Sequence, residues 1–197
     1  MDDRRLSFGE KVKGFLGAPV NTFNNVEAEA LGSALKYFTI WIVIYTILRT
    51  IVFYKLERRI FQTLWDLLGL SDAALYLFHP VTFAVLGVLG AFGGLFIGGS
   101  WTHLFVLAFG GRKGYGNTMK AFAYGYTPVF LFGWIPFVGM LFPVWALVLY
   151  IIGIRQLHQI STGRAIGAVL LGAVTLVIIA VLIGVVVGLL AVIRAVA

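Results

Sequence analysis

Long apolar stretches, separated by short polar and basic segments, dominate the pattern of the chain. Residues 34–53 form the first such stretch, and no residue in 73–111 carries a formal charge. Two further uncharged stretches follow, at 121–154 and 165–193. A helix needs roughly 20 mostly apolar residues to cross a bilayer, and each stretch reaches or exceeds that length. The pattern therefore predicts an all-α, polytopic membrane protein.

The number of crossings depends on how residues 121–154 are interpreted, as one overlong helix or as two short ones. Pro128, Pro136 and Pro143 interrupt this stretch, and Gly133 stands just before Trp134-Ile135-Pro136 near its middle. Because glycine and proline together mark a turn, we favour a hairpin. The result is a five-transmembrane-helix bundle (residues 34–197) after a cytosolic segment (residues 1–33), with spans at about 34–53, 80–109, 118–133, 137–154 and 165–193. A four-span version remains the alternative.

Basic residues set the orientation of the bundle, because Lys and Arg are retained on the cytoplasmic side during insertion. We expect a cytoplasmic N-terminus and a C-terminus outside. Ten basic residues are then inside (Arg4, Arg5, Lys11, Lys13, Lys36, Arg112, Lys113, Lys120, Arg155, Arg164) and four outside (Lys55, Arg58, Arg59, Arg194). The charge bias favours five spans over four only slightly. Arg49, near the outer end of the first span, is expected to extend its guanidinium toward lipid headgroups.

Two polar segments carry amphipathic patterns. Residues 55–70 place Leu56, Ile60, Leu64, Leu67 and Leu68 on one stripe, which predicts a helix lying in the membrane interface. The N-terminal stretch 6–15 is weaker, and we expect Lys11 and Lys13 to contact anionic lipid headgroups.

Composition supports a membrane location and removes several functions. Hydrophobic residues make up 60% of the 197 residues and charged residues only 12%, which excludes a water-soluble globule. Without cysteine, disulfides, thiolate catalysis and cysteine-ligated metals are impossible. The net charge of +7 is explained by topology, so nucleic acid is not an expected partner.

Small residues recur at helical spacing in two spans. Gly90, Gly94 and Gly98 follow one another at four-residue steps, and Gly184 and Gly188 form a second pair. Such faces let two helices approach closely in lipid. We expect other helices to pack there, within this chain or in a homo- or hetero-oligomer.

Catalytic and transport chemistry is sparse. The five predicted spans contain no Asp or Glu, which argues against ion-coupled transport. His79 is expected near the outer face, whereas His103 and His158 are expected near the inner face, so no metal or cofactor is predicted. Ser100 and His103 share a helix face, but no residue is apparent that would orient the histidine as a general base. We therefore expect no enzymatic activity.

Several motifs together resemble one family. They are Tyr124-Gly125-Tyr126-Thr127-Pro128, the segment 136–139, and Trp145 followed by Gly153-Ile154-Arg155-Gln156-Leu157-His158. In this order they are similar to the membrane core of the Yip domain family, whose name refers to interaction with Ypt/Rab GTPases. The N-terminal GFLGAPVNTFNNV resembles the prokaryotic, particularly archaeal, branch. The resemblance implies five spans with a cytosolic N-terminus and, in eukaryotic members, roles in vesicle trafficking. It supplies no catalytic residues.

The eukaryotic Asp-Leu-x-Gly-Pro type motif is not visible before the membrane core, which argues against GTPase binding. The function we expect is a non-enzymatic membrane scaffold, in the cell membrane of a prokaryote. A small passive transporter, channel or lipid-moving protein that uses the proline-broken third and fourth spans is the alternative. The candidate interaction residues are Arg112, Lys113, Tyr124, Tyr126, Pro128, Pro136, Trp145, Arg155 and His158.

Overall fold

The computed structural model describes residues 6–67, 69 and 79–196, and all regular structure in these ranges is helical. The prediction of an all-α fold is thus confirmed. Arg4, Arg5 and Leu68, which took part in the predictions of orientation and of the interfacial stripe, lie outside the described residues. In chain order the elements are α1 (Phe8–Gly17), α2 (Pro19–Val26), α3 (Leu31–Val52), the π-helical turn η1 (Phe53–Glu57), α4 (Arg58–Leu67), α5 (Pro80–Gly93), the π-helical turn η3 (Gly94–Gly98), α6 (Gly99–Ala108), α7 (Tyr115–Gly125), α8 (Thr127–Phe132), the 3₁₀ turn η4 (Val138–Leu141), α9 (Phe142–His158) and α10 (Thr162–Val196).

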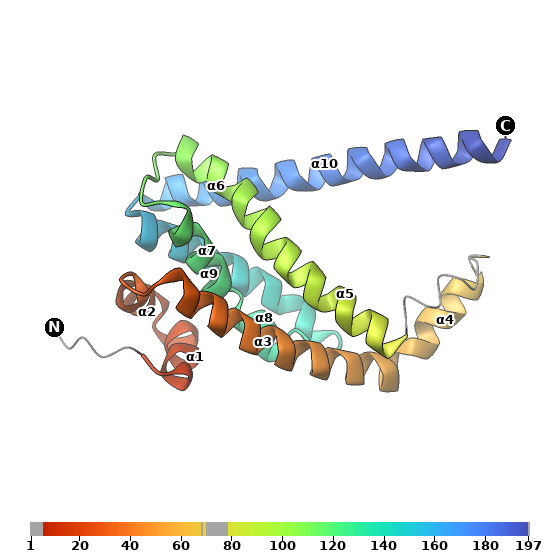
Figure 1. The fold of residues 1–197 in the computed structure, drawn as a ribbon, viewed down its shortest axis with the longest axis horizontal. Helices are drawn as coiled ribbons and strands as arrows, with labels where there is room; N and C mark the ends of the chain where they lie inside the picture. Colours follow the sequence, from red (N-terminus) through yellow and green to blue (C-terminus); the bar gives the residue numbers. More distant parts are fainter. Residues whose placement is uncertain (1–5, 68, 70–78, 197) are drawn as a thin grey trace.

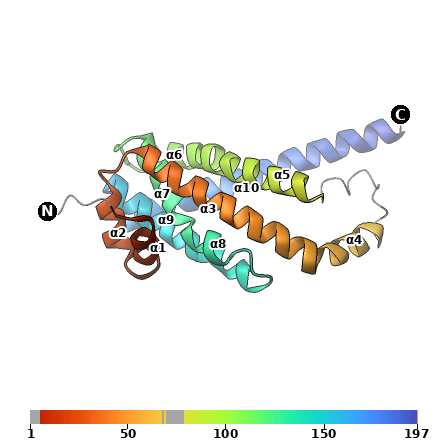
Figure 2. The ribbon, with the colours of Figure 1, turned by 60° about the horizontal axis from the view of Figure 1, so that its bottom comes forward.

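The helices run back and forth along the long axis of the molecule. Helices α1 and α2 lie at one end, and α4 and the last turns of α10 lie at the other (Figures 1 and 2). Helix α7 packs between α3 and α9, while α6 packs against α10. We call the end of the molecule that holds α1 and α2 the α1–α2 end, and the end that holds α4 the distal end.

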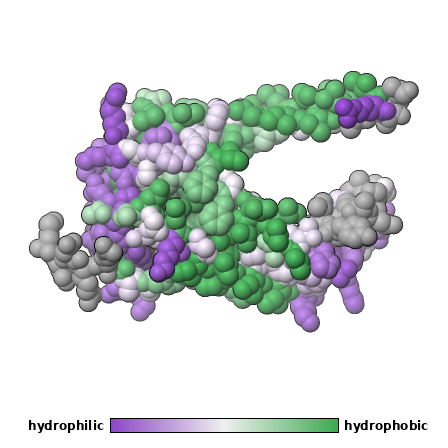
Figure 3. Space-filling model, viewed as in Figure 1, coloured by the Kyte–Doolittle hydropathy of each residue, from purple (hydrophilic) through white to green (hydrophobic). Residues whose placement is uncertain are grey.

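Four helical segments of the described chain are long and apolar enough to cross a membrane. They are Leu31–Leu67, Pro80–Ala108, Val138–His158 and Thr162–Leu190. The predicted span at 118–133 falls on α7 and α8, which have 11 and 6 residues and are separated at Tyr126. In Figure 3, apolar surface covers the middle of the molecule, and hydrophilic residues gather at the α1–α2 end.

Local sequence explains the short N-terminal helices. The Ser7 hydroxyl accepts a hydrogen bond from the Glu10 amide at 3.3 Å, and the Glu10 carboxylate accepts one from the Ser7 amide at 2.8 Å. This capping box satisfies two amides that the first turn of α1 leaves unpaired. Pro19 opens α2, where its missing amide costs nothing. The chain therefore folds back on itself within its first 26 residues.

The core is rich in aromatic side chains at the α1–α2 end. The Phe15 ring stacks on Tyr124 at 5.1 Å between centroids and lies 4.8 Å from Phe23. Phe15, Phe23 and Tyr124 are all fully buried. Since burying one such ring is worth roughly 1.5–3 kcal/mol, these contacts fix α1 and α2 on the membrane helices.

A tight turn joins α8 to α9, and the chain reverses direction there. An added Cβ at Gly139 would lie 2.6 Å from the carbonyl oxygen of Gly133, so the two backbones are in direct contact. The Val138 amide donates to the Pro136 carbonyl at 2.7 Å, which leaves Phe137 at φ 61° and ψ −54°. A three-residue turn of this hand is rare and strained for a residue other than glycine.

The predicted interfacial segment differs from expectation in how it begins. Helix α4 is not a separate helix after a loop, because α3, η1 and α4 follow one another without a break. The extra residue of a π-helical turn shifts the helical register, so the apolar stripe of α4 is rotated relative to α3. In the described part of that stripe, Leu56, Ile60, Leu64 and Leu67 are 50–80% exposed.

Candidate functional site

A buried polar network joins the N-terminal helices to α7. The Lys11 ammonium lies 2.7 Å from Glu29 Oε2, and the Tyr124 hydroxyl donates to the same oxygen at 2.7 Å. The side chains of Lys11 and Glu29 are only 9% and 7% exposed. Lys11 is therefore paired inside the protein, and the expectation that it contacts lipid headgroups is wrong. The structure leaves that role open to Lys13, which is exposed.

Lys120 extends this network from the same helix. Its ammonium donates to the backbone carbonyls of Glu27 at 2.6 Å and Glu29 at 3.1 Å. The Lys120 side chain is buried, so it holds the segment between α2 and α3 instead of contributing to a cytosolic basic surface. Two lysines and one tyrosine thus fasten the N-terminal segment to the bundle.

The break between α7 and α8 is compensated locally. Pro128 has no amide to donate to the Tyr124 carbonyl, which the helical pattern would require. The Thr127 hydroxyl donates to that carbonyl at 2.6 Å and lies 2.9 Å from the Tyr37 hydroxyl. The proline therefore breaks the helix near the predicted position, while the carbonyl freed by it is not available to a ligand.

A second buried network links α6, α7 and α9 through a threonine. The Thr118 hydroxyl lies 2.7 Å from His103 Nδ1 and 2.9 Å from His158 Nε2. One hydroxyl proton serves only one of these nitrogens, so the other histidine must donate to the threonine oxygen. Asn117 adds a hydrogen bond from its side-chain amide to the Leu157 carbonyl at 3.1 Å. The arrangement ties the ends of three helices together.

Ser100 and His103, the residues considered for catalysis, each form a hydrogen bond with a different residue. The Ser100 hydroxyl lies 2.8 Å from the Tyr115 hydroxyl, and His103 bonds to Thr118. The described residues include no group of three His, Asp or Glu side chains that could hold a metal ion.

The candidate interaction residues Arg112, Lys113, Arg155 and His158 do not share one environment. Arg112 and Lys113 are exposed in the loop before α7, and the Arg155 guanidinium bonds to the Thr162 hydroxyl at 3.3 Å. His158, in contrast, is 3% exposed and lies inside the protein. His158 therefore has a packing role and is not part of the surface.

The other motif residues lie in three environments. Tyr124 and Pro128 are buried, and Tyr126 stacks on Phe122 at 4.4 Å. Pro136 lies in the α8–α9 turn. Trp145 is 49% exposed on α9.

The glycines singled out from the sequence face open space in this chain. An added Cβ at Gly90, Gly94, Gly184 or Gly188 would meet no other described atom within 4 Å, and at Gly98 only Phe122 at 3.9 Å. Gly94 and Gly98 are the first and last residues of the π-helical turn η3.

Other glycines make the close helix contacts. A Cβ at Gly125 would lie 3.1 Å from the backbone nitrogen of Tyr150, where α7 crosses α9. A Cβ at Gly153 would lie 2.9 Å from the Ala121 Cβ. Gly125 was named only as part of a motif, and its position between two aromatic residues gives no periodic signal.

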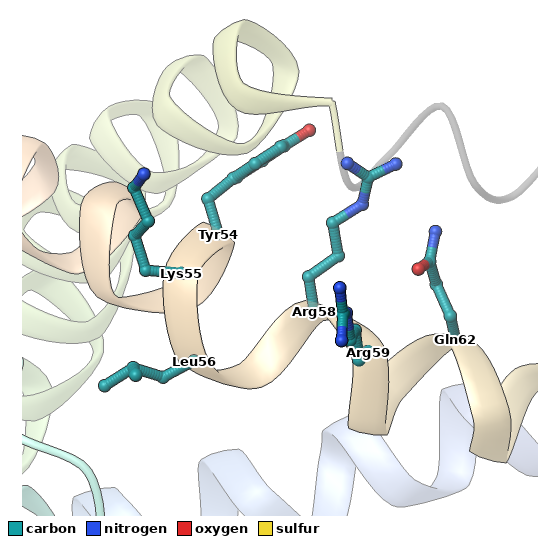
Figure 4. A pocket seen from close by; sticks show the side chains of 6 residues that line it. All are labelled: Tyr54, Lys55, Leu56, Arg58, Arg59 and Gln62. Atoms are coloured by element: carbon teal, nitrogen blue, oxygen red, sulfur yellow. The ribbon is translucent and has the colours of Figure 1, made fainter.

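Two pockets lie at the distal end. The first, of about 460 Å³, is formed between the α3–η1–α4 helix and the α8–α9 turn, and is lined by Arg49, Leu56, Glu57, Ile60, Phe61, Gly133, Trp134, Ile135, Pro136, Phe137, Gly139 and Met140. The second, of about 520 Å³, is lined by Tyr54, Lys55, Leu56, Arg58, Arg59 and Gln62 (Figure 4). We call them the apolar pocket and the basic pocket.

Arg49 lies at the apolar pocket and is paired. Its Nη2 donates to Glu57 Oε2 at 2.8 Å, eight residues further along the chain. The expectation that this guanidinium extends freely to headgroups is therefore corrected, because a carboxylate two turns away provides a partner within the protein.

Comparison with known proteins gives one finding. The Yip1 domain model matches residues 13–193 of the chain. The chain belongs to the Yip1 domain family. The match starts within α1, so it includes the last residues of α1, all of α2 and both Glu29 and Lys120, whereas Lys11 lies two residues before it. No curated protein and no solved structure matched the chain.

Membership in the Yip1 domain family agrees with the motifs that resemble this family, and it fixes the general class of the protein. This Yip1 domain protein is a membrane protein with apolar helices of spanning length. The family is not known for enzymatic activity.

The residues that sequence reasoning missed are chiefly Glu29 and Thr118. A weak signal existed for Glu29, because it is an acidic residue placed directly before a predicted span and Lys120 stands inside an otherwise uncharged region. Thr118 carried no signal, since its role depends on histidines 15 and 40 residues away.

Proposed function

We propose that this Yip1 domain protein is a non-enzymatic scaffold in the plasma membrane of a prokaryote. It crosses the membrane five times with its N-terminus in the cytoplasm, and α4 lies in the opposite interface. It associates with copies of itself or with other integral membrane proteins. GTPases and nucleic acids are not among its expected partners.

The observation that carries this proposal is the distal half of α10. Beyond Ala180 this helix is exposed on all sides in the described residues, and it extends away from the rest of the bundle (Figure 1). Gly184 and Gly188 leave two bare positions one turn apart on it. In lipid, where apolar burial gives no driving force, small residues of this kind are where helices associate.

The test is a change of oligomeric state. Gly184→Leu and Gly188→Leu together would separate helices that meet at this face, so we expect the crosslinked dimer or hetero-complex in native membranes to decrease at least fivefold. Val186→Leu, at an exposed position on the opposite face of the same helix, is the matched control. An association unchanged by the double variant would disprove the α10 interface.

Five crossings are supported by the arrangement of the elements. Helices α1 and α2 and the last turns of α10 lie at opposite ends of the molecule (Figure 1). The broken α7–α8 segment runs beside α9 between these ends, and α7 packs closely on α9 through Gly125. A broken helix is tolerated inside a membrane protein when neighbouring helices and hydroxyl groups satisfy its backbone, as Thr127 does here.

A passive conduit or lipid-moving protein is the second candidate, and the two distal pockets favour it. We expect a scaffold to give no protein-dependent flux of ions, small solutes or fluorescent lipids in proteoliposomes. Flux above that of empty liposomes, abolished by filling the apolar pocket, would favour the conduit.

A further inference from the structure

We propose that the two distal pockets together form a binding site for an anionic phospholipid. One acyl chain occupies the apolar pocket, and the headgroup phosphate is held by Lys55, Arg58 and Arg59. The site differs from the helix faces proposed above for protein association, and neither proposal depends on the other.

The apolar pocket has the chemistry of an acyl-chain site. Its walls come from two separate parts of the chain: Leu56, Ile60 and Phe61 on the helical side, and Trp134, Ile135 and Met140 on the turn side. Its volume of about 460 Å³ lies in the usual range for a small-molecule site. Leu56, Ile60 and Met140 are 60–77% exposed, so the pocket opens to the surroundings of the protein.

The turn that forms one wall is held in a strained shape. Phe137 has a positive φ, and the Gly133 and Gly139 backbones are pressed together behind it. Strain of this kind is concentrated at ligand-binding sites. Here it directs Phe137, which is 87% exposed, to the rim of the pocket.

Arg49 adds a hydrogen-bond donor at the apolar pocket. Its Nη2 bonds to Glu57, whereas its buried Nη1 has no hydrogen-bond partner among the described residues. Because Glu57 balances the charge of the guanidinium, the donor that remains suits a neutral acceptor. The ester carbonyl at the top of a phospholipid acyl chain is such an acceptor.

The basic pocket selects the charge of the headgroup. Lys55, Arg58 and Arg59 all line it, and none of the described residues that line it is Asp or Glu (Figure 4). Arg58 also lies over the Tyr54 ring at 5.0 Å, which limits the positions of its guanidinium. Leu56 lines both pockets, so the cations and the acyl site are adjacent. Each cation near a membrane surface favours an anionic lipid over a neutral one.

The full chain in mild detergent provides the test. It is mixed with phosphatidylglycerol or with phosphatidylcholine carrying the same acyl chains, and retained lipid is counted by native mass spectrometry. We expect phosphatidylglycerol to bind about tenfold more tightly. Glycerol phosphate alone and a free fatty acid alone should each bind far more weakly, because the site recognises both parts together.

Three variants separate the two pockets from general charge effects. Lys55→Gln with Arg59→Gln should remove the preference for phosphatidylglycerol, and Ile60→Trp should reduce binding of both lipids at least fivefold by filling the apolar pocket. Arg112→Gln with Lys113→Gln removes the same charge from the other end of the bundle and is the matched control. Equal binding of the two lipids by the unmodified chain would overturn the proposal. So would an equal loss of preference in the control variant, or unchanged binding by the Ile60→Trp chain.

Discussion

At the scale of single residues, the glycines that matter for packing are those in contact with another backbone. Gly125 touches Tyr150 of α9, and any side chain at this position would enter the space of the neighbouring helix. Gly94 is also a glycine within a helical segment, but an added Cβ there would have no neighbouring atom within 4 Å. The two positions give a direct comparison.

We expect Gly125→Ala to lower the free energy of unfolding by about 2 kcal/mol, because the added methyl group forces α7 and α9 apart. Gly94→Ala should be neutral, or stabilising by up to about 1 kcal/mol, since alanine favours the helix over glycine. Thermal unfolding of both variants in one detergent measures the difference. Equal stability of the two variants would show that the crossing of α7 and α9 is looser than the structure indicates.

The buried ion pair gives a second residue-scale prediction. Glu29→Gln leaves the Lys11 ammonium buried without its carboxylate, so we expect a loss of about 3 kcal/mol and faster proteolysis of the N-terminal segment. Lys11→Met combined with Glu29→Gln removes both charges and should recover more than half of that loss. A double variant as unstable as the single one would mean that Lys11 is not the partner that matters.

At the scale of elements, apolar length and hydrophobicity were enough to place the long helices. The predicted 80–109 stretch corresponds to α5–η3–α6, and the predicted 165–193 stretch lies within α10. The π-helical turns η1 and η3 were not predictable, because one extra residue per turn changes the register without changing composition.

The buried polar networks also could not be predicted from the sequence. Tyr124 is named from the sequence as a motif residue, but its partner Glu29 is 95 residues away. Sequence spacing predicts neighbours on one helix and not contacts between helices. The sequence therefore predicts part of the site, namely Tyr124 and Pro128. The contacts of the charged residues Lys11, Glu29 and Lys120 depend on how α1 and α2 pack on α7 and are seen only in the structure.

The α8–α9 turn allows an element-scale test. Phe137→Gly relieves the positive φ of this residue, so we expect stability in lipid-free detergent to rise by about 1 kcal/mol. Val138→Gly, in the adjacent 3₁₀ turn, should instead destabilise by about 1 kcal/mol because it only adds freedom to the unfolded chain. A loss of stability for Phe137→Gly as large as that for its neighbour would rule out strain at this position.

At the scale of the whole molecule, the proposed five crossings make a prediction about accessibility. The natural chain contains no cysteine, so a single cysteine introduced at an exposed position is labelled uniquely. In intact cells, we expect an impermeant maleimide to label Arg59→Cys and to leave Lys13→Cys unlabelled until the cells are opened. Labelling of Lys13→Cys from outside would reverse the orientation, and equal labelling of Lys13→Cys and Ile193→Cys would require an even number of crossings.

The fastening of α1 to α7 has a mechanical consequence for the whole protein. Because Lys11, Glu29 and Tyr124 form one connected unit, α1 cannot be pulled away from α7 without breaking the buried contacts of Glu29 with Lys11 or with Tyr124. A load applied to the amino-terminal helices is therefore passed directly into the centre of the bundle. In the reverse direction, a tilt of α7 in the bilayer changes which face of α1 is displayed to the aqueous compartment.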